Sequence, residues 1–163
     1  AQPVVVFAGG LSVVLTPRSM RAAMDRDRPT ARRTGTIYLS GLAVAGLGYI
    51  AVAGWDWVLN PMAHIVPSAY VLGGLVTVTV VANIAMAASF LQGAELAGAG
   101  RERTLTGISW LAAIVWVMGG LSAGVSGAYA RPLGATLGGS FKYVVQARVI
   151  RALYEEQAPR ASP

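Results

Sequence analysis

Residues 68–91 read SAYVLGGLVTVTVVANIAMAASFL, and this stretch decides the fold. Its 24 residues are almost all apolar and include no Asp, Glu, Lys or Arg. A helix of this length, rising about 1.5 Å per residue, extends roughly 36 Å and can cross a hydrocarbon layer of about 30 Å. Because polar residues do not alternate along the run, it is not typical of a barrel strand. The sequence therefore predicts a transmembrane helix.

The composition of the whole chain points the same way. Only 12 % of its 163 residues are charged, whereas soluble domains average about a quarter, and 55 % are hydrophobic. Arginine supplies nearly all of the positive charge, and it is concentrated beside apolar runs. This pattern favours an orientation signal and anionic lipid as a partner over nucleic acid. With no cysteine, disulfides and thiolate sites are excluded.

Three further apolar stretches accompany the central one. Residues 36–58 and 104–130 are long enough to span, whereas residues 3–16 would extend only about 21 Å as a helix. Spanning, re-entrant and interfacial positions all remain open for that first stretch, which Pro17 is expected to end. Residues 140–157 suggest a C-terminal interfacial amphipathic helix.

We therefore expect an all-α integral membrane protein with a single polytopic domain over residues 1–163. It would contain three to four transmembrane helices, at about 3–16, 36–58, 68–91 and 104–130, and the C-terminal interfacial helix at about 140–157.

Short loops give the expected topology. Residues 18–35 hold six arginines, while residues 59–67 hold neither Lys nor Arg. The positive-inside rule puts the arginine loop in the cytoplasm, in a multi-pass protein of the inner cell membrane. Arg131 and the four cations after it would then lie on the outer side. Tyr38, Trp55 and Trp57 are expected in the interfacial aromatic belts. The lipid or partner surface of the arginine loop consists of Arg18, Arg21, Arg26, Arg28, Arg32 and Arg33.

Small residues at helical spacing predict where helices approach closely. Such rows let the backbone of another membrane helix come near, and the sequence has two of them. The expected helix-packing residues are Gly41, Ala45, Gly48, Gly120, Gly124 and Ala128.

Residues capable of chemistry are few. The single histidine, His64, excludes bis-histidine haem ligation within this chain, and no GxSxG motif is present. We expect no metal site, no catalytic residues and no cofactor within the chain, although lipids would bind. Asp56, His64 and Asn83 are candidates for a polar site. Because Asp56 lies between two tryptophans at the end of its stretch, we interpret it as an interfacial anchor, with a proton or cation site as the alternative.

These observations favour a non-catalytic helical subunit of a larger membrane complex, for example an energy-transducing (respiratory or photosynthetic) one. Other membrane subunits and anionic lipids would be its partners. The alternative is a small homo-oligomeric transporter or channel that uses Asp56 and Asn83, and an integral membrane enzyme comes third.

Overall fold

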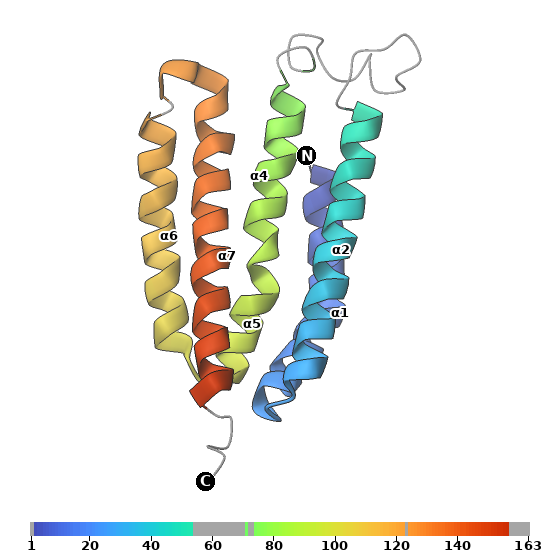
Figure 1. Ribbon diagram of the computed structural model, residues 1–163. Helices are drawn as coiled ribbons and strands as arrows, with labels where there is room; N and C mark the ends of the chain where they lie inside the picture. Colours follow the sequence, from blue (N-terminus) through green and yellow to red (C-terminus); the bar gives the residue numbers. More distant parts are fainter. Residues whose placement is uncertain (1, 54–70, 72–73, 123, 157–163) are drawn as a thin grey trace.

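The computed structural model describes residues 2–53, 71, 74–122 and 124–156, and every regular element within them is a helix (Figure 1). This confirms the all-α class. The expected polar residues Asp56 and His64, with Trp55 and Trp57, fall outside the described residues. The elements are α1 (Gln2–Met24), α2 (Arg28–Ala53), α4 (Leu75–Ala88), α5 (Phe90–Gly98), α6 (Glu102–Ser122), the short 3-10 helix η1 (Gly124–Tyr129) and α7 (Ala130–Glu156).

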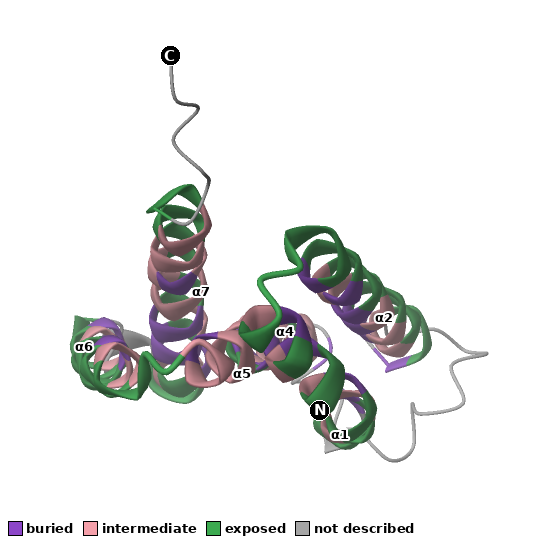
Figure 2. Cartoon of the chain, turned by 90° about the horizontal axis from the view of Figure 1, so that it is seen from below, coloured by how far each residue is buried: buried purple, intermediate pink, exposed green. Residues whose placement is uncertain are grey.

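The long helices run side by side, and α5 continues the line of α4 (Figure 1). Seen along the bundle, α6 and α7 lie on one side, α1 and α2 on the other, and α4 with α5 between them (Figure 2). The turns from α1 to α2 and from α5 to α6 lie at the same end as the end of α7, which we call the lower end. The turn into α6 uses Gly100, whose φ of 71° is readily adopted only by glycine.

Within the described residues, three helices are long and apolar enough to cross a membrane: α2, the combined rod Leu75–Gly98, and α6. Only 17–28 % of the residues in their most apolar windows are buried within the chain. Large apolar side chains such as Val44, Trp110 and Leu121 are instead about 70 % exposed. Burial inside one chain therefore does not account for the hydrophobicity of these helices.

The first helix differs from the expectation for residues 3–16. Pro17 does not end it, because α1 continues to Met24. A proline removes one backbone hydrogen bond, but tertiary packing can hold the helix together around it. Here the turns after the proline are packed: Ser19 and Ala22 are buried, and α1 contacts α2 and α5. Consequently the arginine segment is a helical hairpin whose turn is short, and not an 18-residue loop.

The central rod also extends further than expected. The expected helix ended at Leu91, but α5 continues to Gly98 and carries Gln92 and Glu95. The rod breaks at Ser89, whose hydroxyl donates a hydrogen bond to the Met86 carbonyl oxygen at 3.0 Å. A Cβ on Gly98 would lie 2.7 Å from the Met20 carbonyl oxygen, so the glycine lets the α1 backbone approach. The sequence pattern alone does not reveal this contact.

The last two helices require a larger correction. The expected span 104–130 ends at Ser122, and the expected interfacial helix 140–157 begins ten residues earlier, at Ala130. Pro132 does not stop a helix but lies in the first turn of α7, where its missing N–H costs nothing. The helix α7 then packs lengthwise against α6 and α4. It is thus a member of the bundle and not a separate amphipathic helix.

A buried cluster joins α1, α2 and the central rod. It consists of Ala8, Leu15, Tyr38, Leu42, Ala87 and Leu91. Tyr38 is completely buried, and its hydroxyl donates to the Ala87 carbonyl oxygen at 3.0 Å. It is therefore an interhelical hydrogen-bond donor and not part of an interfacial aromatic belt.

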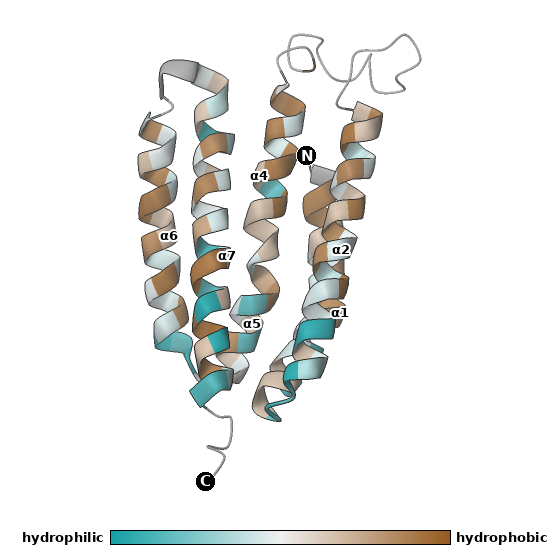
Figure 3. Cartoon of the chain, viewed as in Figure 1, coloured by the Kyte–Doolittle hydropathy of each residue, from teal (hydrophilic) through white to brown (hydrophobic). Residues whose placement is uncertain are grey.

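Hydrophilic residues gather at the lower end of the helices (Figure 3), and most of the described arginines belong to segments at this end. The four cations after Arg131 were expected on the outer side, but Arg148 and Arg151 belong to the part of α7 that ends at the same end of the bundle as the arginine hairpin, and Arg160 falls outside the described residues. Arg131 begins α7 at the other end, and Lys142 lies between. The segments at the lower end carry Arg18, Arg21, Arg26, Arg28, Arg32, Arg33, Arg101, Arg103, Arg148 and Arg151.

Candidate functional site

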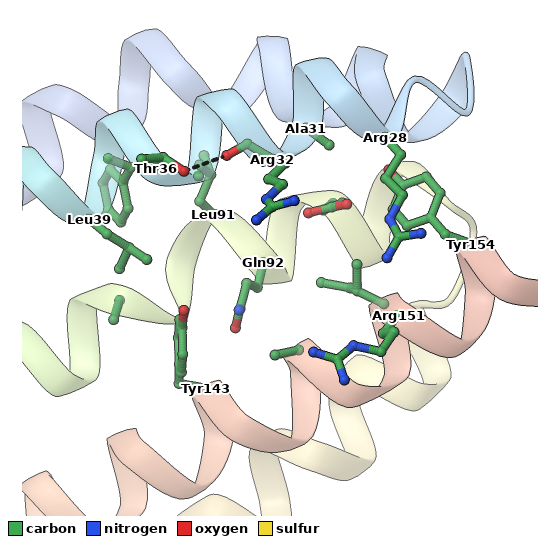
Figure 4. A pocket seen from close by; sticks show the side chains of 16 residues that line it. Arg28, Ala31, Arg32, Thr36, Leu39, Leu91, Gln92, Tyr143, Arg151 and Tyr154 are labelled. Atoms are coloured by element: carbon green, nitrogen blue, oxygen red, sulfur yellow. Dashed lines mark hydrogen bonds between the residues drawn. The ribbon is translucent and has the colours of Figure 1, made fainter.

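A cavity of about 260 Å³ opens between α2, the central rod and α7, toward the lower end of the bundle (Figure 4). Its walls come from three segments far apart in the sequence. The lining residues are Arg28, Ala31, Arg32, Gly35, Thr36, Tyr38 and Leu39 of α2; Ala88, Leu91, Gln92 and Glu95 of the central rod; and Tyr143, Ala147, Ile150, Arg151 and Tyr154 of α7.

Three guanidinium groups surround this cavity. Arg32 and Arg151 extend into it from opposite walls, and Arg28 lies beside Tyr154 (Figure 4). The Arg28 Cζ atom is 5.9 Å from the centroid of the Tyr154 ring, a cation–π distance. Among the described residues the one ion pair joins Arg101 to Glu156, at 3.8 Å, and it is exposed. Neither Arg32 nor Arg151 therefore forms an ion pair with a described carboxylate, although Glu95 lines the same cavity.

Polar groups without partners lie next to these cations. Gln92 projects into the cavity (Figure 4), and its Oε1 atom is buried with no hydrogen-bond partner. Gln146 of α7, which does not line the cavity, is fully buried, and neither of its amide atoms has a partner. Buried amide atoms normally make hydrogen bonds, so each such exception needs an explanation. The cavity thus combines unpaired cations with an unpaired acceptor.

The arginine segment is divided between two hollows. Arg28 and Arg32 line the cavity just described, whereas Arg18, Arg21 and Arg33 line a second hollow between α1 and α2. Arg26 is exposed in the turn, with φ of 58°. The adjacent Asp27 accepts a hydrogen bond from the Thr30 N–H at 3.1 Å, which caps α2. Hydrogen bonding by the Thr30 side chain and by this N–H lowers the pKa of the Asp27 carboxyl group. The remaining candidate, Asn83, is partly buried on α4 and does not line the cavity.

The expected helix-packing residues meet different surroundings. A Cβ on Gly41 would lie 2.9 Å from Leu11 Cδ2 of α1, so this glycine is at a helix contact. At Gly48 it would meet no described atom within 4 Å, and at Gly120 only the Ala130 carbonyl oxygen at 3.5 Å. The Gly120–Gly124 pair does not form a continuous helical row, because α6 ends at Ser122. For the same reason Ala128 lies in η1, where it is exposed, while Ala45 is partly buried on α2.

The close approaches of α7 use other glycines. A Cβ on Gly138 would lie 2.9 Å from the Ala112 carbonyl oxygen of α6, and one on Gly139 would lie 2.7 Å from Met86 N of α4. Gly134 faces α6 in the same way. Gly134 and Gly138 form a GxxxG pair in the sequence, but they lie between the expected elements 104–130 and 140–157 and were not among the expected packing residues.

Sequence reasoning also missed most of the cavity. Arg151, Gln92 and Glu95 had been given no binding role, because their relation to Arg32 depends on how α7 returns along the bundle. Within the described residues no group of three His, Asp or Glu side chains could hold a metal ion.

Neither a protein-family model, nor a curated protein, nor a solved structure matches this chain. The cavity, the charge distribution and the exposed apolar faces are consequently the grounds for a functional proposal.

Proposed function

We propose that this protein is a multi-pass membrane protein that works as a non-catalytic subunit of a larger membrane complex. Its lower end, with the arginine hairpin, faces the cytoplasm. An energy-transducing complex is one suitable host.

The exposed apolar faces are the observation that carries this proposal. Along α6, the side chains of Trp110, Met118 and Leu121 are 62–70 % exposed, and Val13 of α1 and Val44 of α2 exceed 70 %. Continuous apolar faces of this kind mark membrane or protein contacts. The concentration of arginine at one end supports both the membrane position and the orientation, because short cytoplasmic segments are enriched in Lys and Arg.

Glycines with open space beside them support partner helices. A Cβ on Gly9, Gly10 or Gly48 would meet no atom of the described residues within 4 Å. Glycines on apolar helices allow the backbone of a neighbouring helix to approach closely, and membrane helices commonly associate through such positions. The glycines of α7, by contrast, are already occupied by α4 and α6, so they offer nothing to a partner.

The orientation can be tested in the natural cysteine-free background. Single variants Arg26→Cys and Ala63→Cys are treated in intact cells with a thiol reagent that does not cross membranes. Labelling is expected at position 63 and not at position 26 until the cells are opened. Labelling of position 26 from outside would refute the orientation, and extraction of the protein without detergent would refute the membrane position.

Partnership can be tested by purifying the tagged chain in mild detergent and recording the mass of the intact assembly. Unlike chains in fixed stoichiometry are expected. Copies of this chain alone would favour the transporter or channel instead. In that case Asp56→Asn and Asn83→Ala should reduce ion flux in reconstituted vesicles, whereas a subunit with Asp56 as an anchor would keep its assembly.

A further inference from the structure

We propose that the cavity between α2, α5 and α7 binds the headgroup of an anionic phospholipid that carries hydroxyl groups, of the phosphatidylglycerol type. The inference deepens the proposed function, since it rests on the lower end lying at a membrane surface. It adds a defined binding site to the general attraction between arginines and lipid.

The charged side chains that line the cavity favour binding of an anion. Three arginines line it against one carboxylate, that of Glu95, so its net charge is positive. Guanidinium groups bind phosphate through two parallel hydrogen bonds, and Arg32 and Arg151 extend toward the same space from α2 and α7 (Figure 4). Basic pockets between helices near the cytoplasmic side are suited to lipid headgroups.

The hydrogen-bond acceptors in the cavity favour a particular chemical group attached to the lipid phosphate. Gln92 Oε1 is buried without a partner, and Glu95 lines the same space. Both groups accept hydrogen bonds, so a ligand with hydrogen-bond donors would satisfy the buried Gln92 oxygen. Glycerol hydroxyls can do so, whereas a choline group has no donor. An ammonium group would be repelled by the three neighbouring guanidinium groups.

The shape of the cavity favours a lipid over a free phosphate compound. At about 260 Å³ it lies just below the usual range of about 300–1,000 Å³ for ligand pockets, which suits a headgroup. Leu39, Leu91 and Ile150 give it apolar walls next to the polar groups. The helices α2 and α7 do not pack extensively against each other, and Arg28 over the Tyr154 ring is a described contact between them, so the cavity between the two helices has room for a ligand. Acyl chains can leave between these helices while the headgroup stays at the charged end.

Binding of short-chain lipids to the intact, purified protein in detergent tests the proposal. Phosphatidylglycerol is expected to bind at least about tenfold more tightly than phosphatidylcholine with the same chains, a difference of about 1.4 kcal/mol. Arg32→Gln and Arg151→Gln should each weaken phosphatidylglycerol binding about tenfold. The matched controls are Arg33→Gln on α2 and Arg148→Gln on α7, which do not line the cavity and should change affinity by less than about twofold.

A further variant tests the acceptor and does not remove charge. Gln92→Leu should weaken binding of phosphatidylglycerol about fivefold but leave phosphatidic acid, which has no headgroup hydroxyls, unchanged. Water-soluble glycerol 1-phosphate distinguishes the source of the phosphate. Binding of this compound as tightly as the lipid would overturn the lipid assignment in favour of a soluble ligand.

Equal losses in the cavity variants and in their controls would also overturn the proposal, because they would indicate general electrostatic attraction. No preference for phosphatidylglycerol over phosphatidylcholine in the natural protein would do so without any variant. The topology and intact-mass experiments do not depend on these results, so failure of the lipid site and failure of the subunit role remain distinguishable.

Discussion

Gly139 is the position where the packing of α7 against α4 can be tested most directly. A Cβ there would lie 2.7 Å from two backbone atoms, Ala85 C and Met86 N. Backbone atoms cannot rotate away as a side chain can. Restoring an ordinary separation of about 3.4 Å therefore moves the helices apart by roughly 0.7 Å. A gap of that size forfeits about a quarter to a half of the dispersion energy of each affected contact.

These effects give the expected size of the change. Overpacking usually costs about 1–3 kcal/mol, while alanine in place of glycine gains up to about 1 kcal/mol in helix propensity. Gly139→Ala should therefore lower the free energy of unfolding by about 1–2 kcal/mol. Gly107→Ala is the matched control, because a Cβ at this position in α6 meets no described atom within 4 Å. It should be neutral or stabilise by up to about 1 kcal/mol.

Unfolding of both variants can be followed by circular dichroism in detergent micelles, with increasing dodecyl sulfate or temperature. The order of stability is expected to be Gly107→Ala, the natural protein, then Gly139→Ala. If Gly139→Ala proved as stable as Gly107→Ala, α7 would not lie against α4 as described, and the reasoning on its glycines would be refuted.

Three further changes test other contacts of the fold. Tyr38→Phe removes the buried hydrogen bond to the Ala87 carbonyl oxygen and should cost about 1 kcal/mol in the same unfolding measurement; no change would mean that the bond does not form. Asp27→Ala removes the cap of α2 and should lower the melting temperature at neutral pH. Because the hydrogen bond from Thr30 holds the pKa of Asp27 below its ordinary 3.8, the stabilisation is complete above that value and declines as pH falls through the lower, folded-state pKa. Melting curves from pH 7 to pH 3 should therefore converge for the two proteins, and a gap that widened toward low pH would contradict this cause. Glu156→Gln breaks an ion pair whose two side chains are 51 % and 70 % exposed, so a shift in unfolding free energy above about 0.5 kcal/mol would contradict its assignment as a weak surface pair.

The sequence predicted those features that depend on local composition. Apolar runs of about 20 residues identify helices of membrane-spanning length, and α2, the central rod and α6 correspond to three of the four expected stretches. The ends of the helices were less predictable, because they depend on packing. Pro17 lies within a helix whose following turns are buried, and α5 remains helical where Gly98 fits against the Met20 backbone.

The cavity could not be predicted from any single stretch. Arg32, Gln92 and Arg151 are separated by about sixty residues each, and only the course of α7 brings them to one space. One useful signal was present, the GxxxG pair at Gly134 and Gly138, which predicts a helix that packs closely. It was missed because the expected elements ended at residue 130 and began again at residue 140, and a proline in the first turn of a helix cannot be distinguished from a stop by its residue type alone.

The position of α7 between α6 and the central rod has a consequence for how the protein is made. In chain order α7 follows both of the helices it packs against, α4 and α6, and α6 meets the central rod mainly through it. Until α7 has been synthesised, α6 has no helix packed along its length. The backbone at Ala85 of α4 and at Ala112 of α6 then lacks the contacts that Gly139 and Gly138 make with it. The packing of α6 against the central rod through α7 can therefore form only after α7 has been synthesised. A chain interrupted before α7 would keep the three described helices of membrane-spanning length but would leave the surfaces of α4 and α6 that pack against α7 uncovered.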